Sequence, residues 1–129
     1  MSFHVSCSGY GSDDGYGYGY GSDAEQYFAA LLGPHQQSGG VAAFWRSTMS
    51  GTPANGGRGT VGRVGLVEEI PGPLKLCCRN ALHATLQPTR WNGARWWIVL
   101  LHHPVEHQAD KLGSLKRTFV ADLGRCPFT

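Results

Sequence analysis

The chain has 129 residues, 41% of them hydrophobic and only 16% charged, and its formal net charge is +2. That length fits a single domain, because domains typically have about 100–150 residues. No apolar run approaches the ~20 residues of a membrane-spanning helix. Met1 to Val5 lack the basic start and the apolar stretch of a secretory signal, and four cysteines are too few for a dense disulfide framework. We therefore expect a cytoplasmic protein of a host or phage-infected cell, with free thiols and no membrane contact.

The low net charge hides two regions of opposite sign. Residues 1–40 contain four acidic residues and no lysine or arginine, whereas residues 41–129 contain all 11 basic residues and five acidic ones, a balance of +6. All five tyrosines lie between Tyr10 and Tyr27. An acidic, aromatic first part therefore precedes a basic second part, and complementary charge can bring two such parts together within one chain or between copies.

The first part includes a low-complexity stretch, residues 8–22, in which glycine and tyrosine alternate. Glycine makes ordering entropically costly, and no aliphatic side chain in residues 8–22 offsets that cost, so we expect this stretch to be disordered, within a Gly/Tyr-rich tail of residues 1–22. The period of two supports an alternative, because in an extended segment Tyr16, Tyr18 and Tyr20 share one face. Such a stripe could add to a sheet edge or contact another subunit. A phosphate-binding loop is disfavoured, since no strand precedes the glycines.

The predicted domain comprises residues 23–129, and a short helix forms its first element. Ser22-Asp23-Ala24-Glu25 fits a capping box, in which the cap side chain and the glutamate satisfy two backbone N–H groups. Apolar residues follow at helical spacing until Gly33-Pro34 ends the run. A helix of this length needs a partner surface, because short helices are marginal alone.

Short strands dominate the rest of the chain. Trp96–His102 is the clearest, because β-branched and aromatic residues fill it and Asn92-Gly93 gives a turn before it, while Pro104 limits its extension. Asp110–Gly124 is ambiguous between helix and strand, and its alternation favours a strand. The other predicted strands are Val41–Arg46, Leu74–Cys78, Leu82–Leu86 and one that Val64, Leu66 and Val67 open and Pro71-Gly72-Pro73 ends. The fold class is therefore α+β: a small, mostly antiparallel sheet with one or two short helices behind a Gly/Tyr-rich N-terminal segment.

Histidines are the most suggestive candidates for chemistry. His103 and His107 would share a face on a helix, but Pro104 and the preceding strand argue against a helix there. His83 and His102 stand apart from them, and no cysteine or histidine pairing has the spacing of a zinc site. We therefore predict no metal site and no cofactor, and we expect ordinary polar or half-buried histidines.

The tryptophan pair is a candidate contact surface. In a strand, alternation turns one ring of Trp96 and Trp97 inward and the other outward, and an exposed tryptophan often anchors a protein interface. Arginines interleaved with Trp91 and this pair would also suit single-stranded nucleic acid. The basic residues are scattered, however, and +6 over residues 41–129 is modest. We therefore favour a core and a protein contact over nucleic-acid binding.

The C-terminal half also carries a family pattern. Its elements are Gly72-Pro73-Leu74-Lys75-Leu76-Cys77, Leu82-His83-Ala84-Thr85, a hydrophobic strand, Asp110-Lys111 and Lys116-Arg117. This order, over about residues 60–125, resembles an uncharacterised domain family of phage and bacterial genomes that has cysteine, a short gap, Leu-His-Ala, Asp-Lys and Arg. Ala81 stands where that family usually has glycine. The resemblance implies a phage or mobile-element origin and no activity, because none is established for the family.

A weaker likeness of pattern is to ADP-ribosyltransferases, through Leu82–Ala84 before a hydrophobic strand. By that analogy His83 would bind a nucleotide, with Arg79 or Lys111 on its phosphate. The candidate acids are Glu68, Glu69 and Glu106. Their positions in the sequence make no compelling arrangement, so the analogy concerns pattern only.

The sequence therefore favours binding over catalysis, although enzyme activity stays open, and no catalytic residue is assigned. We expect a non-enzymatic accessory or structural protein of phage type, in the cytoplasm or the virion, that binds other proteins or itself. The predicted contacts are Tyr16, Tyr18, Tyr20, Trp96 and Trp97. The alternatives are an inhibitor of host defence that binds a host protein complex, and a nucleotide-binding or ADP-ribosyltransferase-like enzyme that uses His83.

Overall fold

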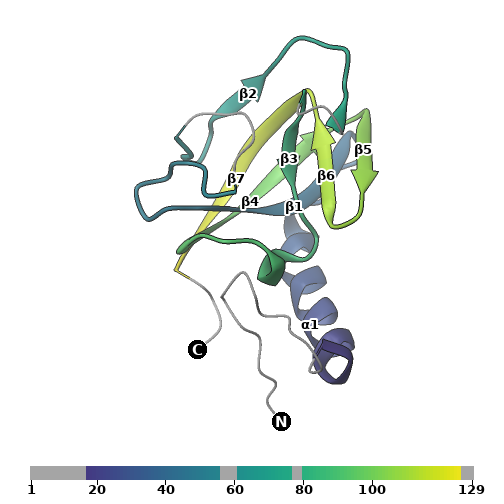
Figure 1. Ribbon diagram of the computed structural model, residues 1–129, viewed down its shortest axis with the longest axis vertical. Helices are drawn as coiled ribbons and strands as arrows, with labels where there is room; N and C mark the ends of the chain where they lie inside the picture. The colour runs from purple at the N-terminus through teal and green to yellow at the C-terminus, as the bar shows by residue number, and fades with distance from the viewer. Residues whose placement is uncertain (1–16, 56–60, 77–79, 126–129) are drawn as a thin grey trace.

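A computed structural model of the chain describes residues 17–55, 61–76 and 80–125, with side chains from residue 25 onward (Figure 1). These residues form the helix α1 (Gly17–Leu32), two 3₁₀ turns, η2 (Gly33–His35) and η4 (Pro88–Arg90), and two antiparallel sheets. The strands are β1 (Gly40–Ser47), β2 (Val67–Glu69), β3 (Leu82–Ala84), β4 (Arg95–His102), β5 (Val105–Gln108), β6 (Lys111–Ser114) and β7 (Lys116–Arg125). The predicted α+β class is confirmed.

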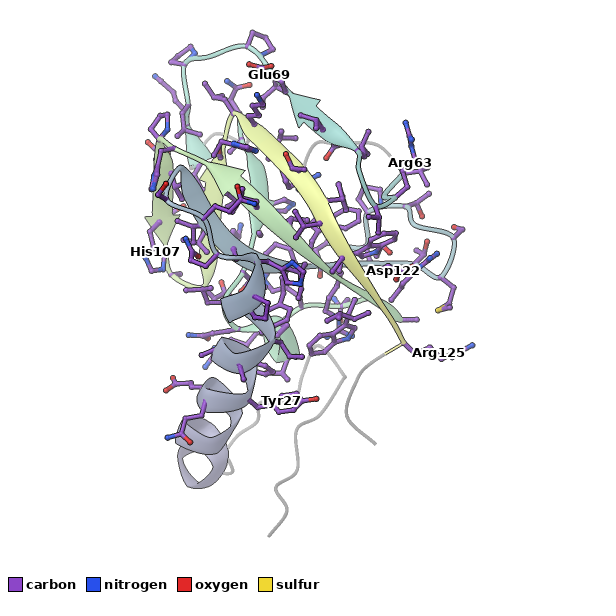
Figure 2. The ribbon with its side chains drawn as sticks, turned by 180° about the vertical axis from the view of Figure 1, so that it is seen from behind. Tyr27, Arg63, Glu69, His107, Asp122 and Arg125 are labelled. Carbon is purple, nitrogen blue, oxygen red and sulfur yellow. The ribbon has the colours of Figure 1, made fainter. Side chains whose placement is uncertain are left out.

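One long bent hairpin contributes to both sheets. The larger sheet has the order β1-β4-β7-β2 and the smaller the order β3-β6-β5. Strand β4 ends at His102, as Pro104 predicted, and the chain resumes as β5, while β6 leads into β7. The sheets also meet where the backbones of Phe44 and Thr85 exchange hydrogen bonds of 2.8 and 2.9 Å. Figures 1 and 2 show the smaller sheet on one side of the larger one and α1 on the other.

On the helix side, α1 packs against β1 and β4. The Phe28 ring centroid lies 5.4 Å from that of Phe44 and 6.4 Å from that of Trp96. Leu32 and Leu100 belong to the same buried cluster. This is the partner surface that the helix was predicted to need, because packing on β1 and β4 removes its apolar side chains from water.

On the opposite side, the two sheets enclose the main core. Trp45, Trp97 and Phe119 meet edge to face or tilted, with centroids 5.0–6.5 Å apart. Ala84 of β3 and Leu112 of β6 close the cluster from the smaller sheet. Strand β4 therefore lies between α1 and the smaller sheet, and both of its faces are covered.

That coverage corrects the expectation for the tryptophan pair. The side chains alternate as predicted, but Trp96 is 0% exposed and Trp97 is 1% exposed. Neither ring reaches the surface, because a helix covers one face of β4 and a second sheet covers the other. The prediction that one of them forms a protein contact is wrong.

The helix begins earlier than its sequence predicts. It starts at Gly17, before the predicted cap at Ser22. Tyr18 and Tyr20 therefore lie on helical backbone, where residues two apart do not share a face, so these two do not form the extended stripe of the alternative interpretation. Tyr16 and the remainder of the predicted tail, residues 1–16, lie outside the described residues.

The strand predictions have mixed outcomes. β1, β3 and β4 confirm strands in three predicted segments, and β6 and β7 confirm strands in 110–124. The strand predicted to open at Val64 begins only at Val67, as β2, because residues 64 and 65 form a turn. The strand at Leu74–Cys78 is wrong where the structure describes it. Lys75 and Asn80 pair in an isolated bridge, and the Asn80 side chain donates to the carbonyls of Pro71 and Pro73, which holds a turn there.

A buried ion pair lies within the larger sheet, and its arginine also binds the smaller sheet. Arg117 of β7 is 0% exposed, and its Nε donates to Glu68 Oε1 of β2 at 3.0 Å. Its Nη1 donates to the backbone oxygen of His83 in β3 at 2.7 Å, and its Cζ lies 5.0 Å from the Trp45 ring centroid. Burial lowers the pKa of Arg117, and the Glu68 carboxylate opposes that shift. Arg117 thus links three strands from both sheets.

We predict that Glu68→Gln lowers the free energy of unfolding by about 3–5 kcal/mol, because it leaves the charge of Arg117 buried without its carboxylate. Chemical denaturation measures this loss. The matched control is Asp122→Asn, which removes the carboxylate of the Arg95–Asp122 pair at the surface. Water screens that pair, so the control should lose far less. Equal losses in the two variants would contradict a special role for the buried pair.

Candidate functional site

The structure does not gather the predicted nucleotide ligands into one site. His83 is only 7% exposed, and its ring centroid lies 4.9 Å from that of Trp91. It lies opposite Gly113 in the strand register. Lys111 is exposed two positions along the same strand, β6, and Arg79 lies outside the described residues. The imidazole is therefore enclosed by protein, while the nearest predicted phosphate ligand on β6 is at the surface.

The candidate acids are dispersed. Glu68 binds Arg117 in the core, Glu106 accepts a hydrogen bond of 2.8 Å from the backbone N–H of Leu76, and Glu69 is exposed on β2. His107 lies in β5, so it shares no helix face with His103. Within the described ranges, no three histidine, cysteine, aspartate or glutamate side chains are placed to hold a metal ion.

The arginines beside the tryptophans have internal roles. Arg46 is buried beside the Trp96 ring, with its Cζ 5.0 Å from the ring centroid. It donates to the carbonyls of Pro88, Trp91 and Gly93, at 2.9 Å for Pro88. Burial lowers the pKa of Arg46 to about 10. Its guanidinium thereby holds the 88–93 loop against β1, which is a structural role.

A half-open surface lies beside α1. Because α1 packs on β1 and β4, it leaves part of β7 uncovered on the same side (Figure 2). We call this part of β7 the open strip, and its half-buried residues are Thr118, Val120, Ala121 and Leu123. The last three pack against the helix-side cluster from outside. Because the apolar side chains of the open strip are only half-buried, another segment could pack on them.

A second group of exposed apolar side chains lies on the segment that leads into the outermost strand, β2. Among the described residues, the exposed large hydrophobics include Val61, Val64 and Val67, at 50%, 56% and 51% exposure. We call these three residues the valine edge. Arg63 lies between the first two, and Glu69 follows the third on β2. Figure 2 shows Arg63 and Glu69 along that same side of the molecule. Several exposed apolar side chains within one short segment are typical of a contact surface.

The valine edge could not be predicted from the sequence, for a physical reason. A spacing of three residues matches neither the alternation of a strand nor the sustained pattern of a helix. The segment was therefore expected to be the start of an ordinary strand. Its exposure follows from the sheet order, which places β2 outermost beside β7. The three-residue repeat itself was the only signal in the sequence.

Comparison with models of protein families, with curated proteins and with solved structures finds no match for this chain. In the part of the chain that the structure describes, α1 and the shorter helices fall short of what is needed to cross a bilayer.

One titratable group lies beside the open strip. The Nε2 of His102 is 2.8 Å from Thr118 Oγ1. Partial burial and the positive charge of Lys116 lower the pKa of His102, while Glu69 opposes them. The folded chain therefore resists protonation of His102 more than the unfolded chain does.

We predict that the contribution of His102 to the free energy of unfolding is complete above the ordinary histidine pKa of about 6.5. It is lost as the pH falls through the lowered pKa of the folded state, because the unfolded state then binds more protons. Urea titrations at stepped pH measure the slope, and His102→Gln should flatten it. His103→Gln, an exposed neighbour, is the control. A slope that His102→Gln leaves unchanged would contradict this assignment.

Proposed function

We propose that this chain acts by binding protein and that it self-associates through the valine edge. The observation that carries the proposal is the half-exposure of Val61, Val64 and Val67, three valines on the segment that leads into the outermost strand β2. Burying such side chains against a partner is favourable by about 25 cal/mol per Å² of apolar surface. Addition of a long partner strand is disfavoured, because β2 has only three residues and Pro71 follows soon after. The valine side chains therefore make the contact.

Charge along the edge favours a second copy as the partner. Arg63 and Glu69 stand toward opposite ends of the edge and are both exposed. When two copies meet across a two-fold axis, the same patch faces itself in reverse order. That order sets Arg63 of each copy against Glu69 of the other, with Val64 and Val67 between them. Opposite charges at both ends fix the register of such an interface.

The proposal includes the biological role that the sequence resemblance implies. An assembling protein of phage type would serve as an accessory or structural component, in the cytoplasm or in a virion. Tyr16, Tyr18 and Tyr20 stay proposed as further contacts between copies. The alternative partner for the same edge is a host protein complex, with a complementary apolar surface and the same charge pattern.

We predict that Val64→Lys raises the dissociation constant of self-association at least tenfold, which corresponds to ~1.4 kcal/mol. The added lysine charge would have to be buried in the interface. Size-exclusion chromatography with light scattering across a concentration series measures the constant. Leu86→Lys is the matched control, since Leu86 is also exposed, at 42%, but lies outside the valine edge.

A charge exchange tests the two-fold arrangement. Arg63→Glu should weaken self-association, because it sets two acids against each other, and adding Glu69→Arg to the same chain should restore it. A chain that stays monomeric at every concentration would overturn the proposal. Loss of association on changing the three tyrosines to serine, with Val64→Lys neutral, would move the interface to the tyrosine segment.

A further inference from the structure

The larger sheet is covered unevenly on its helix side. A four-stranded sheet normally buries its faces against packed layers, and here α1 contacts β1 and β4 through Phe28 and Leu32. The open strip on β7 remains half-buried beside the helix. In Figure 2 the Tyr27 side chain points from α1 toward the side on which β7 ends at Arg125. The open strip is thus bordered by a helix flank on one side and by the outer edge of the sheet on the other.

We propose that residues 1–16 of the same chain lie on the open strip, alongside α1. The composition of this segment fits such a site. Phe3, Val5 and Tyr10 supply apolar and aromatic side chains that could cover Val120 and Leu123. In Ser2–Ser8, apolar and polar residues alternate at Phe3, Val5 and Cys7, and that alternation is typical of a segment with one buried face.

Charge supports the same occupant. Asp13 and Asp14 are the acidic residues of the segment, which has no lysine or arginine. Lys116 and Arg125 are exposed at the two ends of β7, and Arg63 lies along the outer side. Glu69 lies opposite Lys116 in the strand register, so an acidic segment gains most Coulomb energy toward Arg125 and Arg63.

The length of the segment permits the contact within one chain. Helix α1 has 16 residues, which corresponds to about 24 Å at 1.5 Å per residue. The 16 residues before it span up to ~50 Å when extended, enough to turn back along the helix and reach the strip. A short tether also gives an effective concentration in the millimolar range, so the chain's own segment outcompetes a second copy at ordinary concentrations.

Nuclear Overhauser spectroscopy on the whole chain tests this proposal. The sample mixes isotope-labelled and unlabelled chains that carry Val64→Lys, which keeps them apart if self-association uses the valine edge. We expect cross-peaks from the ring protons of Phe3 or Tyr10 to the methyl groups of Val120 or Leu123 within the labelled chains. Asp14→Lys should remove most of their intensity, and Glu25→Lys, the same charge change on α1, should leave them in place.

Each outcome decides the proposal. Cross-peaks only between labelled and unlabelled chains would overturn it and assign the strip to the segment of a second copy. A complete absence of such cross-peaks, with β4–β7 backbone contacts intact, would overturn it and leave the strip for a foreign partner. The self-association measurements above have a separate readout, so failure of one proposal does not decide the other.

Discussion

The position of Arg117 is the constraint on which the rest of the architecture depends. A guanidinium without any exposure loses the hydration that water would give it, and several kcal/mol of that cost must be offset. Here the compensation comes from the Glu68 carboxylate, the backbone oxygen of His83 and the faces of Trp45 and Phe119. These partners lie on β2, β3, β1 and β7. Satisfying one side chain therefore fixes β2 beside β7 and the smaller sheet over the larger, and lysine could not provide the same forked geometry.

The tryptophan pair shows how far local periodicity reaches. Alternation correctly assigns Trp96 and Trp97 to opposite faces of β4, because side-chain direction is a property of the strand itself. Whether a face of β4 is exposed to solvent depends on residues far away in the sequence. Phe28 of α1 covers one face, and Leu112 of β6 helps to cover the other. Because both faces of such a strand are buried, its sequence is a continuous apolar run without alternation, as in Trp96–Leu101.

Features that depend on local sequence could be predicted, whereas features that depend on distant elements could not. The strands β1, β4 and β7 follow from composition and turns, and so does the α+β class. The Leu74–Cys78 prediction failed because the side chain of Asn80 and the flanking prolines make a turn that alternation alone does not reveal. The valine edge and the open strip depend on sheet order, and no rule of spacing gives the order β1-β4-β7-β2.

The contrast between an acidic first part and a basic second part takes a different meaning once the arginines are placed. In the interior, Arg46 donates hydrogen bonds to backbone carbonyls and Arg117 forms an ion pair with Glu68. At the surface, Arg95 forms an ion pair with Asp122. The basic surplus at the surface is therefore smaller than composition suggests, which weakens the case for a phosphate backbone as partner. Among the exposed bases, Arg63 and Arg125 lie along the outer side of the larger sheet, beside apolar groups. Positive charge combined with exposed aliphatic surface suits an acidic, aromatic protein segment, and residues 1–16 have that composition.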